Sequence, residues 1–158
     1  MPEPAEWVPG DAPLARVASK DDVLSGRDDP AVVVLDARPS RQFRGETVWF
    51  ETGDVPADAE GIAHTPRGDL PAGRVPWARN VPWYDLYAED STLLPMDRLK
   101  ERFATAGATP GSRAVTYCGV GISAAALTYA LHRAGIDADL YDASWEEWGR
   151  SGNEIVRG

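Results

Sequence analysis

One stretch, in which a strand turns through glycines directly into a helix, most constrains the fold of this chain. Residues 114–117 favour a strand, Cys118 follows as the only cysteine, and Gly119 and Gly121 precede an alanine-rich segment. This order predicts a helix over residues 122–134 whose free N-terminal N–H groups face the turn. A helix N-terminus stabilises a thiolate, so the stretch predicts a nucleophilic Cys118 in an anion-binding loop.

Two other interpretations of this turn stay open. A lone cysteine at a strand end is often only a small buried hydrophobic residue. Residues 119–124 also fit a variant of the dinucleotide-binding turn, and Asp142 lies about 20 residues further on, as a ribose-binding acid would. The dinucleotide interpretation leaves the cysteine without a role.

The remaining pattern alternates between strands and helices. The predicted strands are 14–18, 31–36, 78–83, 114–117 and 138–141. The predicted helices are a short one after Ser19, then 40–44, 95–106, 122–134 and a final turn over 145–149 that Ser144 caps. This alternation predicts an α/β domain with a central parallel sheet of about five strands and helices on both faces.

The length of 158 residues fits one domain. We expect residues 1–13 to form a flexible arm or linker, 14–152 to form the domain and 153–158 to form a tail that frays from Ser151. Residues 46–76 are rich in proline and glycine, so we expect an irregular segment there. Its His64 is a weak catalytic candidate, because a lone loop histidine is most often only solvated.

Charge and composition exclude several classes of partner. The net charge of −9 argues against binding to nucleic acid or to an anionic membrane surface. The sequence shows neither an apolar run of membrane-spanning length nor a secretory signal, and a single thiol fits a reducing compartment, so we expect a cytoplasmic protein. One cysteine and two histidines do not make a zinc ligand set, and we expect neither a metal nor an organic cofactor.

Four segments, taken in order, make the chain resemble the rhodanese superfamily, and in particular the catalytic, C-terminal-type domain of thiosulfate and 3-mercaptopyruvate sulfurtransferases. These segments are 34–38 with Phe43 and Gly45, then 73–83, 118–123 and 141–148. The resemblance implies that Cys118 takes a sulfur atom from a donor as a persulfide and passes it to an acceptor. It also implies that the loop N–H groups hold the persulfide, namely those of Gly119, Val120, Gly121, Ile122 and Ser123.

The resemblance also implies a set of substrate-binding or site-shaping residues. They are Asp36, Arg38, Gln42, Arg74 and Trp145. For Asp36 and Arg38 we favour a structural ion pair over direct catalysis. Gln42 stands where the family has a substrate-binding arginine. Its neighbours Arg41 and Arg44 are candidates for that charge, and so are Arg74 and Arg79.

The partners that follow are a small sulfur donor, either 3-mercaptopyruvate-like, thiosulfate or a persulfide, and a thiol or cyanide acceptor. A sulfur-carrier protein is a further candidate. The main alternative is a non-catalytic rhodanese-like interaction module, but such modules typically lose the cysteine that this chain retains. A cysteine-dependent phosphatase or arsenate reductase is disfavoured, because the arginine needed six residues after the cysteine is Ala124 here.

Overall fold

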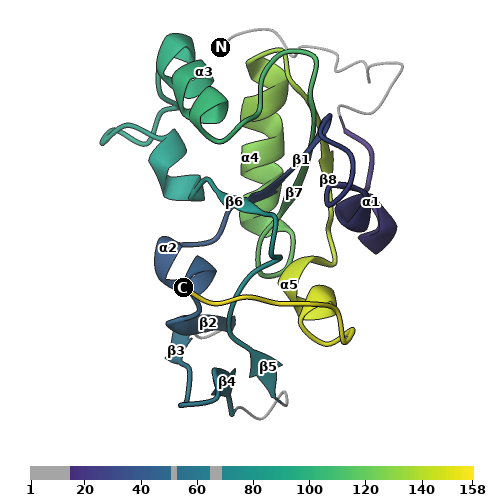
Figure 1. The fold of residues 1–158 in the computed structure, drawn as a ribbon. Helices are drawn as coiled ribbons and strands as arrows, with labels where there is room; N and C mark the ends of the chain where they lie inside the picture. The colour runs from purple at the N-terminus through teal and green to yellow at the C-terminus, as the bar shows by residue number, and fades with distance from the viewer. Residues whose placement is uncertain (1–14, 51–52, 65–68) are drawn as a thin grey trace, which may run out of the picture.

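The centre of the molecule is a four-stranded parallel sheet. The computed structural model describes residues 15–50, 53–64 and 69–158, so the predicted arm over 1–13 lies outside the described residues. The strands are β1 (Val32–Asp36), β6 (Arg79–Asn80), β7 (Arg113–Tyr117) and β8 (Asp137–Leu140). Their spatial order is β6-β1-β7-β8, and every pair is parallel (Figure 1).

The sheet is smaller than predicted at both edges. The expected edge strand over 14–18 contributes only one parallel bridge, between Val17 and Leu140, and Leu14 lies outside the described residues. The strand expected over 78–83 is reduced to two residues because Pro82 has no N–H to give to a ladder. The 3₁₀ helix η1 (Trp83–Leu86) begins directly after this proline.

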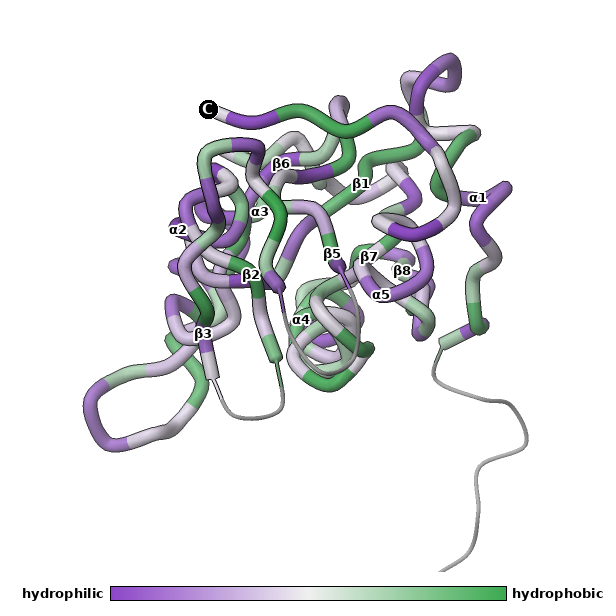
Figure 2. Tube along the Cα trace, turned by 90° about the horizontal axis from the view of Figure 1, so that it is seen from below, coloured by the Kyte–Doolittle hydropathy of each residue, from purple (hydrophilic) through white to green (hydrophobic). Residues whose placement is uncertain are grey.

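Side chains alternate between two buried clusters on opposite faces of the sheet. In β1, Val34 joins one cluster and Leu35 joins the other, and in β7 Val115 and Ala114 divide in the same way. This is the period-two pattern of a strand covered on both faces. Figure 2 shows β1 as a green, hydrophobic segment, as its run of valines and leucine predicts.

Helices cover both faces, as the sequence predicted. On one face, α3 (Met96–Thr105) and α4 (Ile122–Arg133) pack with η1. On the other face lie α1 (Lys20–Ser25) and α5 (Ser144–Trp148), whose two tryptophans are buried. A short helix, α2 (Ser40–Phe43), follows β1. The longest of these, α4, has 12 residues, and none of the helices in the described parts of the chain has the length and apolar character needed to cross a bilayer.

The segment 46–76, which we expected to be irregular, contains two short antiparallel hairpins at one end of the molecule (Figure 1). The first pairs β2 (Thr47–Phe50) with β3 (Gly53–Pro56), and the second pairs β4 (Ile62–Ala63) with β5 (Leu70–Pro71). Val48, Phe50 and Leu70 are buried in the cluster that also holds the α5 tryptophans. The prediction failed because proline and glycine shorten these strands without preventing apolar contacts.

The C-terminal residues are docked, and the prediction of a frayed tail is wrong. Val156 forms an antiparallel bridge with Arg74, and the N–H of Gly158 donates to the carbonyl of Arg44 at 3.0 Å. The C-terminus therefore lies beside α2 (Figure 1). The indole of Trp148 adds a hydrogen bond to the carbonyl of Glu154 at 3.2 Å, so backbone pairing holds a segment whose sequence carries no strand signal.

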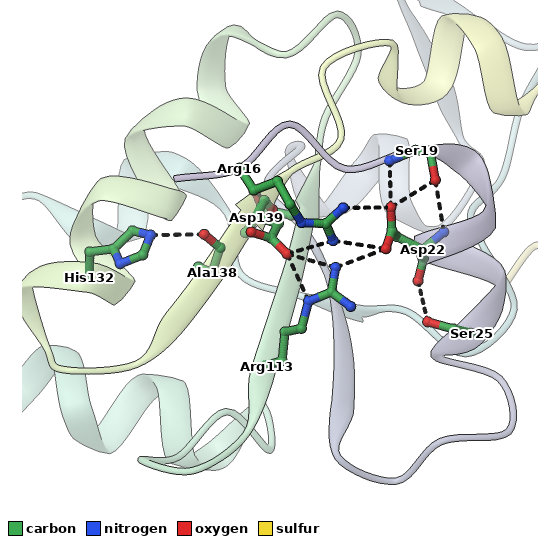
Figure 3. Close-up of polar contacts among 9 residues, drawn as sticks. Arg16, Ser19, Asp22, Ser25, Arg113, His132, Ala138 and Asp139 are labelled. Carbon is green, nitrogen blue, oxygen red and sulfur yellow. Dashed lines mark hydrogen bonds and ion pairs between the residues drawn. The ribbon is translucent and has the colours of Figure 1, made fainter. Parts of the chain in front are cut away.

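The N-terminal edge is fixed by a charged network (Figure 3). Arg16 and Arg113 both bind Asp22 and Asp139, at distances between 2.7 and 3.0 Å. The hydrogen bond from Arg16 is the main cause that lowers the pKa of Asp22 to about 2. Ser19 caps α1 as predicted, in a capping box with Asp22.

Candidate active site

The candidate site lies at the carboxyl ends of the two central strands. From β1 the chain first builds β6 on one side and then returns to build β7 on the other side. Adjacent parallel strands whose connections diverge in this way leave a crevice beyond their carboxyl ends. Asp36 pairs with Tyr117 in the register of β1 and β7, so Ala37 and Cys118 leave the sheet side by side.

Cys118 is a free cysteine and only 2% exposed. Its N–H donates to the hydroxyl of Ser144 at 3.1 Å, and its carbonyl accepts from the N–H of Trp145 at 3.0 Å. The carbonyl of Gly119 accepts in the same way from Glu146 at 3.1 Å. The start of α5 therefore holds the cysteine loop from behind. The predicted role of Ser144 as a helix cap is wrong, because its hydroxyl makes no capping bond and binds the loop instead.

The loop needs glycine at position 121. Gly121 has φ +88°, and a Cβ there would lie 2.9 Å from the carbonyl oxygen of Asp142. Helix α4 begins at the next residue, and its first hydrogen bond runs from Ala125 N–H to Gly121 carbonyl. The N–H groups of Ile122 and Ser123 precede that ladder, as the first donors of a helix do. The arrangement provides backbone donors and the positive end of a helix beside Cys118.

Asp36 and Arg38 form the buried ion pair that the sequence predicted. Arg38 Nη2 lies 2.6 Å from Asp36 Oδ2, and the same nitrogen donates to the carbonyl of Gly73 at 2.7 Å. The side chains are 2% and 0% exposed. Burial opposes the charge of Arg38, but the Asp36 carboxylate outweighs this effect and raises the pKa of Arg38 above its ordinary value. Because Asp36 offsets its charge, Arg38 brings no net positive charge to the site.

Trp145 shapes the site from beneath. The Arg38 guanidinium lies over the Trp145 ring, 4.4 Å from the ring centroid. The indole N–H of Trp145 donates to the carbonyl of Pro71 at 2.9 Å. Tyr117 lies on the same guanidinium at 5.5 Å. Burial, reinforced by Asp36, raises the pKa of Tyr117 well above its ordinary value, so this phenol stays protonated. The aromatic pair fixes the plane of Arg38 and thereby the end of β1.

A cleft of about 370 Å³ opens over the cysteine. Among the predicted site residues, its walls include Arg38, Gln42, Cys118, Gly119, Val120, Ile122 and Ser123. The cleft is completed by residues that the sequence did not single out as site residues, namely Pro39, Trp49, Gly53, Asp54 and Trp83. Asp36, Gly121 and Trp145 support the site from behind and do not line it. The structure therefore brings most of the predicted residues to one place.

Gln42 lies in the cleft wall and is 1% exposed. Its Nε2 donates to the carboxylate of Asp54, while its Oε1 has no partner within the described parts of the chain. Arg74 is not part of this wall: its guanidinium donates to the Gly158 carbonyl at 2.6 Å and lies over the Phe43 ring. The expectation that Arg74 faces a substrate therefore has no geometric support. Arg79 lines a separate cavity of about 620 Å³ beside α3.

Three of the unpredicted wall residues, Trp49, Gly53 and Asp54, come from the first hairpin. Trp49 covers Gly119, and a Cβ added to Gly119 would lie 3.2 Å from the Trp49 ring. Asp54 lies opposite Trp49 on the paired strand β3. No local signal marks these residues, because only hairpin formation brings them to the cysteine. Trp83 lies within the 73–83 segment that carries the family resemblance, and a place in the core or the cleft wall is what the sequence predicts for most of the tryptophans.

The described residues contain no group of three or more His, Cys, Asp and Glu side chains arranged to hold a metal ion. His64 is exposed and lies between the carboxylates of Asp58 and Asp69, at 2.7 and 2.8 Å. The hydrogen bonds that His64 donates to Asp58 and then to Asp69 raise the pKa of His64. His64 is not among the cleft residues, and this contact closes the second hairpin.

Comparison with known proteins identifies the fold. Residues 19–151 match the Rhodanese-like domain family. The chain belongs to this family. The putative thiosulfate sulfurtransferase SseB of Mycobacterium tuberculosis H37Rv is 37% identical over 117 residues, covering 74% of this chain and 35% of the relative. The 3-mercaptopyruvate sulfurtransferase of Escherichia coli K12 is 31% identical over 134 residues, covering 84% of this chain and 42% of the relative.

The crystal structure of SseA from Escherichia coli shares the fold, with a TM-score of 0.59 at 28% identity over 89% of this chain and 45% of that chain. This likeness confirms the predicted rhodanese-like α/β architecture. The chain spans about a third to two fifths of the length of the curated relatives it matches.

Proposed function

We propose that this rhodanese-like domain is a sulfurtransferase that carries sulfur as a persulfide on Cys118. The observation that carries the proposal is the placement of the lone thiol at the floor of a cleft, directly before the N-terminus of α4. A thiolate or persulfide anion is stabilised at this position by backbone N–H groups and by the helix dipole. The sulfurtransferase names of the relatives support the same chemistry.

The reaction proceeds in two displacements. The Cys118 thiolate attacks the outer sulfur of a donor, a new S–S bond forms, and the bond from that sulfur to the rest of the donor breaks with its electron pair. The N–H groups of Gly119, Val120, Gly121, Ile122 and Ser123 then hold the terminal sulfur of the persulfide. In the second step an acceptor thiolate or cyanide attacks that sulfur, and Cys118 leaves as a thiolate. No external oxidant or reductant is consumed.

Other side chains in this scheme position the loop. Asp36 and Arg38 fix the end of β1, and Trp145 and Ser144 fix the loop from α5. None of these four transfers a proton or a sulfur atom. The candidate donors are thiosulfate, 3-mercaptopyruvate and a persulfide, and a sulfur-carrier protein is a candidate acceptor.

The test is intact-mass spectrometry after separate incubation with thiosulfate, 3-mercaptopyruvate and a low-molecular-weight persulfide. We expect a gain of one sulfur atom that a thiol reverses and that Cys118→Ser abolishes. Serine is close to cysteine in volume, so the variant should fold like the wild type. Failure to gain sulfur from any donor, with the thiol shown to be reduced, would favour a binding module instead.

A further inference from the structure

The charge of the cleft does not suit an anionic substrate. Arg38 is the only cationic side chain among the described residues that line it, and Asp36 offsets that charge at 2.6 Å. Asp54 adds an exposed carboxylate to the wall, and no cationic side chain of the described residues forms an ion pair with it. Counted with Asp36 behind it, the described cleft therefore carries one net negative charge, while the positive potential lies at the N–H groups beside Cys118.

The position of Asp54 is held by a buried group. Gln42 is 1% exposed, and its Nε2 donates to Asp54, which ties the carboxylate of β3 to α2. A glutamine that ties down a carboxylate does not neutralise it. Asp54 therefore offers the cleft a fixed negative charge with the rest of its hydrogen-bonding capacity available.

The rest of the wall is aromatic and apolar. Trp49 covers Gly119, and Trp83, which also lines the cleft, is 42% exposed. Ile122, which is 77% exposed, adds an aliphatic surface at the mouth. Indole rings attract cations and also pack against alkyl chains. These walls therefore favour a short alkyl segment that ends in a positive charge.

We propose that the cleft selects small aminothiols and their persulfides, with the sulfur at the N–H groups and the ammonium at Asp54. This rests on the proposed function of Cys118. With an aminothiol as acceptor, its thiolate attacks the outer sulfur of the Cys118 persulfide, the S–S bond to Cys118 breaks, and the products are an aminothiol persulfide and the Cys118 thiolate. The ammonium only binds and takes no part in the transfer of the sulfur atom.

The experiment compares two acceptors that differ in charge. Cysteamine carries an ammonium and 3-mercaptopropionate carries a carboxylate, and each is used to discharge the preformed persulfide in a single turnover. Because their thiols differ in intrinsic reactivity, the quantity compared between variants is the ratio of the two rates. We expect Asp54→Asn to lower the cysteamine to 3-mercaptopropionate ratio about fivefold, the size of a solvent-accessible charge pair.

A matched control is Asp137→Asn, which removes the same charge from the opposite end of the sheet. Asp137 starts β8, is exposed and pairs in register with Arg113 at the amino end of β7. We expect this variant to leave the ratio unchanged. A ratio that falls equally in both variants, or in neither, would overturn the proposal.

A binding measurement separates this proposal from the sulfurtransferase proposal. Tryptophan fluorescence of Cys118→Ser is titrated with cysteamine and with 3-mercaptopropionate, so that no chemistry is required. Tighter binding of cysteamine that weakens with an added Asp54→Asn supports the charge selection, even where no persulfide forms in the mass experiment. Equal binding of the two probes refutes the selection, even where the persulfide does form.

Discussion

The buried pair of Asp36 and Arg38 should be far more important for stability than an exposed pair of the same length. Arg44 and Glu46 provide the comparison, because both pairs have an N···O distance of 2.6 Å. The side chains are 2% and 0% exposed in the first pair, and 48% and 45% exposed in the second. Distance is thus held constant while burial changes.

Arg38→Met removes the guanidinium and leaves the Asp36 carboxylate buried without its cation. It also leaves the carbonyl of Gly73 without the donor at 2.7 Å. Breaking a buried pair in this way costs about 3–5 kcal/mol, whereas Arg44→Met should cost far less because water already screens that exposed pair. With an m-value of about 2 kcal/mol/M, urea unfolding followed by tryptophan fluorescence should show a midpoint lower by about 2 M for Arg38→Met alone.

A double variant distinguishes an unpaired charge from lost packing. Asp36→Asn combined with Arg38→Met leaves no charge behind, so it should be destabilised by less than the sum of the two single variants. The reasoning is refuted if Arg38→Met and Arg44→Met lower the free energy of unfolding by equal amounts. It is also refuted if the two single costs simply add.

Three further predictions concern other parts of the chain. The pKa of His64 is raised in the folded state, so its ion pairs stabilise the fold fully below pH 6.5 and are lost as pH rises through the folded-state pKa. The thermal midpoint of His64→Gln should therefore approach that of the wild type at alkaline pH. Gly121→Ala should cost about 2 kcal/mol more in urea unfolding than Gly111→Ala, because both glycines have positive φ but only Gly121 has a carbonyl within 4 Å of the added Cβ. Ser144→Ala should cost about 1–3 kcal/mol by leaving the buried N–H of Cys118 unpaired, and slower persulfide formation in the mass assay would show that the loop itself has moved.

The elements that the sequence predicted well are those with a strong local pattern. The run of valines before Asp36 predicts β1, and the segment after Gly121 predicts α4 to within a residue at its C-terminal end. The parallel arrangement and the helices on both faces follow from alternation alone. The Cys118 loop could be predicted equally well, because its strand, glycine turn and helix are consecutive in the chain.

Two of the failures share one physical cause, which is that long-range contacts override weak local signals. Residues 153–158 have no strand pattern, yet Val156 pairs with Arg74 across the domain. The hairpins of segment 46–76 are stabilised by burying Val48 and Phe50, a contact that no local rule for proline and glycine anticipates. In both places, pairing with a distant element decides the structure.

In this site, the residues for the chemistry lie in one local segment, whereas the residues for specificity come from distant segments. The reacting sulfur and its backbone donors come from one continuous segment, and backbone N–H groups do not titrate or depend on side-chain identity. The walls come from elsewhere: Trp49 and Asp54 from the first hairpin, Gln42 from α2 and Trp83 from the residues after β6. Substitutions in those walls can therefore change which molecules reach Cys118 without changing how the proposed persulfide is held. This is the reason to expect the charge of Asp54 to alter the choice between acceptors.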